Sequence, residues 1–184
     1  MNKSAIQLNY DEAKITGYEL ANEGYIFGLF IIIGLETGLR SADILNLEKS
    51  NFISDGGKYL IKFTAQKNKK KAIRPISKYT FQKAMEQPKN IIFYNEKYKC
   101  KYSHIWTSRN MKQWFSNYIG KAKANDKNVS AHSLRKSAGC KVYQKYGIEG
   151  ARDFLQHDSY DTTKNYLQIT ETELNEKIKD ALCL

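Results

Sequence analysis

The sequence predicts a mainly α-helical α+β fold with one small antiparallel sheet of three strands. Helical hydrophobic periodicity covers most of the chain. Between residues 51 and 77 it gives way to short segments rich in β-branched and aromatic residues, separated by DGG and by the lysine-rich TAQKNKK. At 184 residues the chain can bury a core without disulfides or metals, so we expect residues 1–184 to form one domain.

The N-terminal third predicts two helices, at residues 10–22 and 25–37. The second is nearly all apolar, which indicates a central buried helix, and it is too short to span a bilayer. TGLR then breaks the pattern, because Gly38 supplies a permissive backbone position. Ser41 is expected to cap a short helix in ADILNLEKS.

The predicted strands are NFIS, KYLIKF and KAIRPIS. Helical patterns return at 78–87, 108–123, 130–146, 148–155 and from about 160. The last residues predict a further helix, because Leu174, Ile178 and Leu182 recur every four positions.

The net charge and the cysteines indicate which partners, cofactors and cellular compartment to expect. Thirty Lys and Arg against 19 Asp and Glu give a net charge of +11, which favours a polyanion such as nucleic acid; a merely soluble lysine-rich surface is the alternative. The three cysteines form no CxxC pair, so we expect no disulfide framework, metal or cofactor. Reduced thiols and the lack of a signal-like segment predict a cytoplasmic protein with no membrane contact.

A metal-free site that cuts DNA needs a defined set of side chains. Arginine suits the phosphate, because its planar fork bonds two oxygens and stays charged at any working pH. A hydroxyl nucleophile must attack in line, and a proton donor must reach the leaving oxygen.

The chain offers such a set. Arg40 follows the buried helix, and Lys67 lies in the turn between two predicted strands. His132 and Arg135 are three residues apart, so both project from one helical face. His157 lies in FLQHDS, ahead of two tyrosines.

From about residue 10 to 170 these segments resemble the tyrosine recombinase (phage integrase) family. In that family the first arginine follows a TGLR turn and has a supporting acidic residue three positions later, here Arg40 and Asp43. The family lysine lies in a β-hairpin turn before a proline, which matches Lys67 and Pro75. The HxxR box is HSLR, residues 132–135.

The resemblance also chooses between the tyrosines. The family nucleophile lies nine residues after the histidine, behind a TTxxY segment, which here selects Tyr166 over Tyr160. Two positions depart from the family pattern: Gln156 stands where glycine usually precedes the histidine, and Lys136 where a second histidine is frequent. Neither departure removes a reacting group, although Gln156 could shift the turn that presents His157.

The resemblance implies roles for the phosphate-binding residues and for the proton-transfer residues. Arg40 and Arg135 would clamp the scissile phosphate with a hydrogen bond from His157.

Tyr166 would form a 3′-phosphotyrosyl bond and release a 5′-hydroxyl, Lys67 would protonate that leaving oxygen, and His132 would assist the proton transfer at the tyrosine. Further basic side chains are expected to meet backbone phosphates and add salt-dependent affinity without sequence choice: Lys69, Lys70, Lys71, Arg74, Arg109 and Lys136.

The implied function is a site-specific DNA recombinase of a bacterium or phage, with double-stranded DNA as partner. We expect a homotetramer on DNA and a monomer when free. The C-terminal helix at about 171–184 would pack either on its own domain or on a neighbouring protomer. Family members usually carry a helical core-binding domain first, which is absent here, so the chain is either a catalytic domain of a longer protein or a single-domain recombinase.

Two alternatives stay open. A type IB topoisomerase would share the chemistry but relax supercoils without pairing sites. A non-catalytic DNA-binding module would keep the fold and form no covalent adduct.

Overall fold

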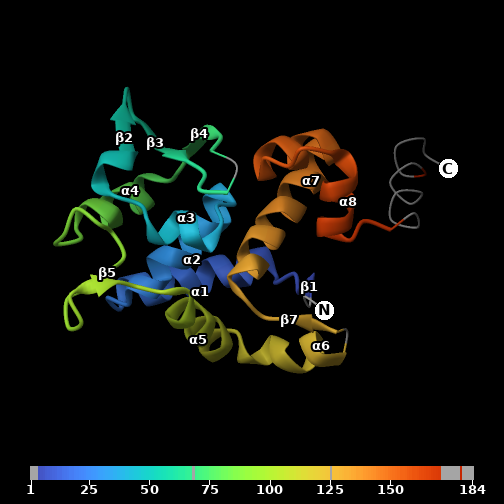
Figure 1. Cartoon of the computed structure of the whole chain (residues 1–184), viewed down its shortest axis with the longest axis horizontal. Coiled ribbons are helices and arrows are strands. Elements are labelled where there is room, and N and C mark those ends of the chain that lie inside the picture. The colour runs from blue at the N-terminus through green and yellow to red at the C-terminus, as the bar shows by residue number, and fades with distance from the viewer. Residues whose placement is uncertain (1–3, 68, 125, 171–178, 180–184) are drawn as a thin grey trace. The chain divides into compact units, whose positions relative to one another are not determined.

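The computed structural model describes residues 4–67, 69–124, 126–170 and 179. Residues 1–184, expected to form one domain, divide into two compact units, Met1–Ala138 and Gly139–Leu184. Figure 1 shows their helices and the small sheet of the first unit. The α+β class with one three-stranded antiparallel sheet is confirmed.

The first unit is built on two antiparallel helices, α1 (Tyr10–Asn22) and α2 (Ile26–Thr37). Both lie within a residue of their predicted bounds, and α2 is buried on every side between Phe27 and Leu35. The two helices approach closely through glycine: a Cβ on Gly28 would lie 2.3 Å from the backbone nitrogen of Ala21. The apolar run is therefore the centre of the core, as predicted.

The chain leaves α2 through a left-handed residue. Gly38 has φ 63° and ψ 17°, and its N–H donates to the carbonyl of Gly34. The next helix, α3 (Ser41–Leu45), begins one residue earlier than predicted, with Arg40 in the cap position. Ser41 is consequently the first helical residue, so the prediction that it caps the helix is wrong, and no side chain takes over that bond.

The three predicted strands form an antiparallel meander in the order β2-β3-β4: β2 (Phe52–Asp55), β3 (Lys58–Thr64) and β4 (Lys71–Pro75). Ile61 faces Phe52 on one side and Arg74 on the other, and it belongs to the core of the first unit. The β3–β4 hairpin (Figure 1) therefore has one buried face, and Lys67, in the turn between its strands, is exposed.

The remainder of the first unit is more broken than its periodicity predicts. After α4 (Lys78–Met85), the helix expected at 108–123 begins at His104 and is interrupted after Trp114. The result is α5 (His104–Trp114), the 3₁₀ turn η2 (Ser116–Tyr118) and α6 (Ile119–Ala124). Phe115, at the interruption, is buried in the core with a non-helical ψ of 35°.

Two short strand pairs were not predicted. β1 (Ser4–Ala5) pairs in parallel with β7 (Lys127–Asn128), and β5 (Tyr94–Asn95) pairs with β6 (Cys100–Lys101). Two residues per strand are too few to show an alternating pattern.

Helix α7 (Ala131–Leu155) contains the predicted break: Gly147 has φ 69° and ψ −168°, which is not helical. In the second unit, α7 is followed by α8 (Tyr160–Leu167), whose cap Ser159 accepts a hydrogen bond from the N–H of Thr162. The core of this unit consists of Cys140, Ala151, Leu155 and Leu167.

Leu174, Ile178 and Leu182, predicted to line a C-terminal helix, lie outside the described residues. Among the residues that are described, none of the helices has the length and apolar character to cross a membrane. The same residues contain no group of three or more His, Cys, Asp or Glu side chains able to hold a metal ion.

Candidate active-site residues

The TGLR turn organises the residues of the first unit that are predicted to bind phosphate. Thr37 donates its hydroxyl to the carbonyl of Ile33 at 2.6 Å, which secures the last turn of α2. The left-handed conformation of Gly38 then turns its own carbonyl out of the helix, where it accepts a hydrogen bond from Nη1 of Arg135. The HxxR arginine is thus anchored, 97 positions away in the chain, to the residue two before Arg40.

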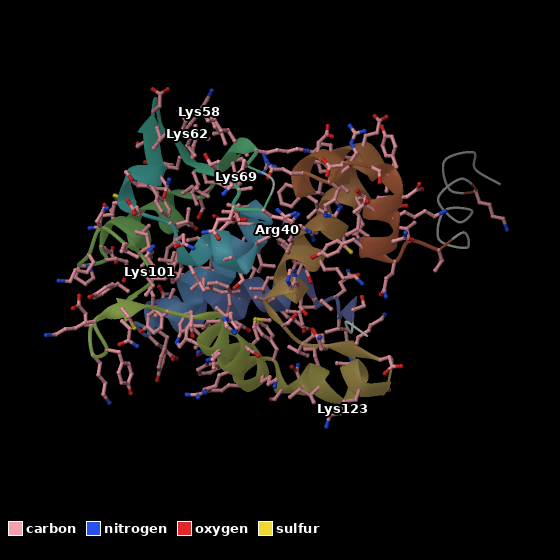
Figure 2. All side chains as sticks on the ribbon, in the orientation of Figure 1. Arg40, Lys58, Lys62, Lys69, Lys101 and Lys123 are labelled. Carbon is pink, nitrogen blue, oxygen red and sulfur yellow. The ribbon has the colours of Figure 1, made fainter. Side chains whose placement is uncertain are left out.

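The two arginines differ in exposure. Arg135 is only 4% exposed, and Arg40 is half-buried in the cap position of α3 (Figure 2). A buried guanidinium keeps its charge, so the site carries fixed positive charge where water is partly excluded. That arrangement favours binding of an anion.

His132 reports the field of both arginines. Although His132 is exposed, the surrounding protein removes part of its hydration, and this lowers its pKa from the usual 6.5. The charges of Arg135 and then of Arg40 lower the pKa further. Both guanidinium charges therefore act on this imidazole, and the structure brings Arg40, His132 and Arg135 together. At neutral pH the ring is uncharged and can accept a proton.

Asp43 connects α3 to the lysine-bearing hairpin. Its carboxylate is 6% exposed and accepts a hydrogen bond from the backbone N–H of Gln66 at 2.9 Å. Gln66 directly precedes Lys67, which is exposed in the β3–β4 turn as predicted. Asp43 thus joins the hairpin turn to the helix that begins after Arg40.

In the second unit the structure brings His157 and Tyr166 together. Their rings meet edge to face, with centroids 5.2 Å apart and planes at 85°, and both side chains are half-buried. The His157 Nδ1 atom lies 3.1 Å from the hydroxyl oxygen of Thr163, a contact that sequence reasoning missed. The TTxxY segment was the signal that could have found it.

Tyr160 has different partners. It is 43% exposed, its hydroxyl donates to the Glu149 carboxylate at 3.1 Å, and the Arg152 guanidinium lies 4.5 Å from its ring centre. These contacts join Tyr160 to the C-terminal part of α7, whereas the ring of Tyr166 packs against the ring of His157.

The departure at Gln156 has a structural consequence. This residue adopts φ 52°, in the left-handed region where glycine is favoured. The turn that carries His157 therefore keeps a conformation suited to glycine despite the larger side chain.

The predicted phosphate-contacting residues divide by exposure. Lys69, Lys70, Lys71 and Arg109 are exposed, whereas Arg74 is half-buried and burial lowers its pKa. Lys136 is only 3% exposed, so the structure does not favour it as a phosphate contact. Arg135, the residue before it on α7, is buried as well.

Other exposed lysines were not singled out from the sequence. Lys58 and Lys62 lie on β3, at its start and in its second half, and the turn that follows this strand carries Lys69 (Figure 2). Lys101 and Lys123 lie elsewhere on the first unit. The hairpin is therefore basic along its strand as well as at its turn.

We predict that an NMR titration of His132 has a midpoint below 6.5. Arg135→Gln should raise the midpoint more than Arg40→Gln, and Arg109→Gln should leave it unchanged, with folding of each variant checked by circular dichroism. Because unfolded His132 binds a proton that the folded protein resists, its contribution to stability is present above pH 6.5 and is lost as the pH falls. A wild-type midpoint at or above 6.5 would contradict a lowering of the His132 pKa by its surroundings and by the two arginines.

We predict that Gln156→Gly increases the free energy of unfolding by about 0.5–1 kcal/mol, because glycine removes the left-handed penalty but adds chain entropy. The matched control is Gln144→Gly on the exposed, helical side of α7, which should decrease it by about 1 kcal/mol. Urea denaturation measures both. Equal losses in the two variants would show that the left-handed turn costs nothing.

Comparison with known proteins identifies the family and the fold. Residues 19–173 match the sequence model described as "Phage integrase family". A search of curated proteins found no match.

Solved structures match as well. They include XerH site-specific recombinase bound to difH substrate (TM-score 0.69, 20% identity, 97% of this chain and 55% of that chain). XerA recombinase also matches, with a TM-score of 0.68 and 20% identity over 97% of this chain and 65% of that chain. A lambda integrase dimer bound to a COC′ core site matches with a TM-score of 0.65 and 19% identity over 91% of this chain and 49% of that chain.

The chain thus spans between about half and two thirds of the length of these structures. At these identities the likeness shows the fold, which is that of the tyrosine recombinase catalytic domain. Since the family model covers most of the sequence, this chain belongs to the phage integrase family.

Proposed function

We propose that this chain carries out the strand cleavage and rejoining of a site-specific DNA recombinase, through a 3′-phosphotyrosyl intermediate at Tyr166. The observation that carries the proposal is the grouping of Arg40, His132 and Arg135 around the TGLR turn. The pairing of His157 with Tyr166 supports it from the second unit.

The two arginines would bind the scissile phosphate. A phosphodiester repels nucleophiles through its own charge, and the five-coordinate phosphorus of the transition state concentrates that charge on the non-bridging oxygens. Arg135 is buried and anchored to the Gly38 carbonyl, so its guanidinium needs little reorganisation during the reaction. Arg40 and His157 would complete the set of donors.

His132 would accept the proton of Tyr166. A phenol with a pKa near 10 is a weak nucleophile at neutral pH, so its proton must move to a base during attack. The lowered pKa keeps His132 neutral and hence able to accept it. The phosphotyrosyl bond conserves the energy of the phosphodiester, so religation needs neither ATP nor a metal.

Lys67 would protonate the 5′ oxygen that leaves. The hairpin turn is exposed, which suits a residue that must reach the DNA, and the Asp43–Gln66 bond sets its distance from α3. The exposed Lys69, Lys70, Lys71 and Arg109 would contact the backbone and make binding by this chain salt-dependent.

Double-stranded DNA is the proposed partner, bound in the cytoplasm by four copies of the chain, which would be monomeric when free. The matched complexes of XerH and lambda integrase with DNA support DNA as the partner.

We expect covalent trapping on a denaturing gel to identify the nucleophile. The chain is mixed in EDTA with duplexes from the DNA that flanks its own gene, nicked so that the 5′-hydroxyl fragment diffuses away. A shifted protein–DNA band should form with wild type and Tyr160→Phe and disappear with Tyr166→Phe, because only Tyr166 is next to His157 in the proposed site.

Loss of the band with Tyr160→Phe alone would identify Tyr160 as the nucleophile and contradict the assignment to Tyr166. No band with any variant, despite binding at low salt, would favour the non-catalytic DNA-binding module. Relaxation of a plasmid that lacks any specific site would favour the type IB topoisomerase.

We expect Lys67→Ala to lower single-turnover cleavage about 10²–10³-fold on ordinary DNA, because the leaving alkoxide loses its proton donor. DNA with sulfur in place of the 5′-bridging oxygen should restore the rate, since a thiolate leaves without protonation. In the matched control, Lys69→Ala should affect the oxygen and sulfur substrates alike, through weaker DNA binding. An equal defect of Lys67→Ala on both substrates would exclude Lys67 as the acid.

A further inference from the structure

We infer that Thr163 is a positioning residue that fixes the tautomer and the orientation of the His157 imidazole. The inference deepens the proposed function, because His157 is one of the groups proposed to bind the scissile phosphate. It depends on three atoms of the second unit, all at the junction between α7 and α8.

The Thr163 hydroxyl lies between an acceptor and the imidazole. Thr163 is fully buried on α8, and its hydroxyl donates to the backbone carbonyl of Ser159 at 3.2 Å. The same oxygen lies 3.1 Å from Nδ1 of His157. The N–H of Thr163 also donates to the Ser159 carbonyl, at 3.3 Å, so both the backbone and the side chain of Thr163 are bonded to Ser159.

The chemistry of a hydroxyl decides the direction of each bond. A threonine has one hydroxyl hydrogen, and a backbone carbonyl can only accept. With both contacts made as hydrogen bonds, the hydrogen points to Ser159 and the oxygen presents a lone pair to Nδ1. For that contact to be a hydrogen bond, Nδ1 must carry the proton, which leaves Nε2 unprotonated in the neutral ring.

This tautomer determines how His157 can act on DNA. A ring protonated at Nδ1 donates a hydrogen bond through Nε2 only in its cationic form. His157 would therefore meet the phosphate as a positive charge, in addition to Arg40 and Arg135. The bond to Thr163 also fixes rotation of the ring, whose edge-to-face contact with Tyr166 then follows from the same constraint.

The test measures the tautomer directly, by the ¹⁵N shifts of the imidazole nitrogens in the full chain at a pH where His157 is neutral. The chain has three histidines, so His157→Gln assigns the signals. Wild type should carry the proton on Nδ1. Thr163→Val, which keeps the shape but not the hydroxyl, should move it to Nε2, and Thr163→Ser should restore Nδ1.

The matched control is Thr162→Val. Thr162 is the neighbouring threonine, exposed, and its hydroxyl contacts Ser159 rather than the imidazole. This variant should leave the proton on Nδ1. Thermal denaturation of all variants identifies any that fails to fold, in which case Thr163→Ser and Thr163→Ala replace the valine comparison.

Covalent cleavage gives the functional readout. Thr163→Val should lower the single-turnover rate about tenfold, the equivalent of one lost hydrogen bond, and Thr163→Ser should retain most of it. A wild-type proton on Nε2, or a tautomer unchanged in Thr163→Val, would overturn the inference. A shifted tautomer with an unchanged rate would overturn its functional half. Absence of cleavage in wild type would count against the proposed function but leave the tautomer result standing.

Discussion

The hydrogen bond from Arg135 to the carbonyl of Gly38 is the interaction on which the candidate phosphate site depends. Gly38 ends α2, so its carbonyl belongs to the helix terminus where the peptide dipoles concentrate negative charge. A guanidinium that is 4% exposed there gains a partner for its charge as well as a fixed position. The left-handed turn that makes this possible also sends the chain into the extended conformation of Arg40. One glycine therefore positions both arginines.

Much of this architecture could be predicted from the sequence. The apolar periodicity of α1 and α2, the change of period at the sheet and the break at Gly147 are local signals, and each is present in the structure. The interruption after Trp114 could not be predicted, because it follows from burial of Phe115 in the tertiary core. Burial by distant elements overrides local helical pattern.

The candidate site shows the same division. Its residue types and order were predictable by resemblance, whereas the bonds that hold them were not. Asp43 with Gln66, and Arg135 with Gly38, join segments 23 and 97 positions apart, so no local pattern encodes them. Lys136 shows the same limit: it follows the exposed His132 by four residues on one helical face, yet it is only 3% exposed, so local spacing does not predict its burial.

The Asp43–Gln66 hydrogen bond allows the hairpin turn to be either bound to α3 or released from it. It joins α3 to that turn, and opening the turn has to break it. A charge-assisted bond of this kind contributes about 1.5–3 kcal/mol, so a turn held by it alone would open in roughly one molecule in ten to one in two hundred. Such openings are far more frequent than unfolding of the whole unit. Opening the turn in this way would move Lys67 while the separate hydrogen bond between Arg135 and Gly38 stays intact.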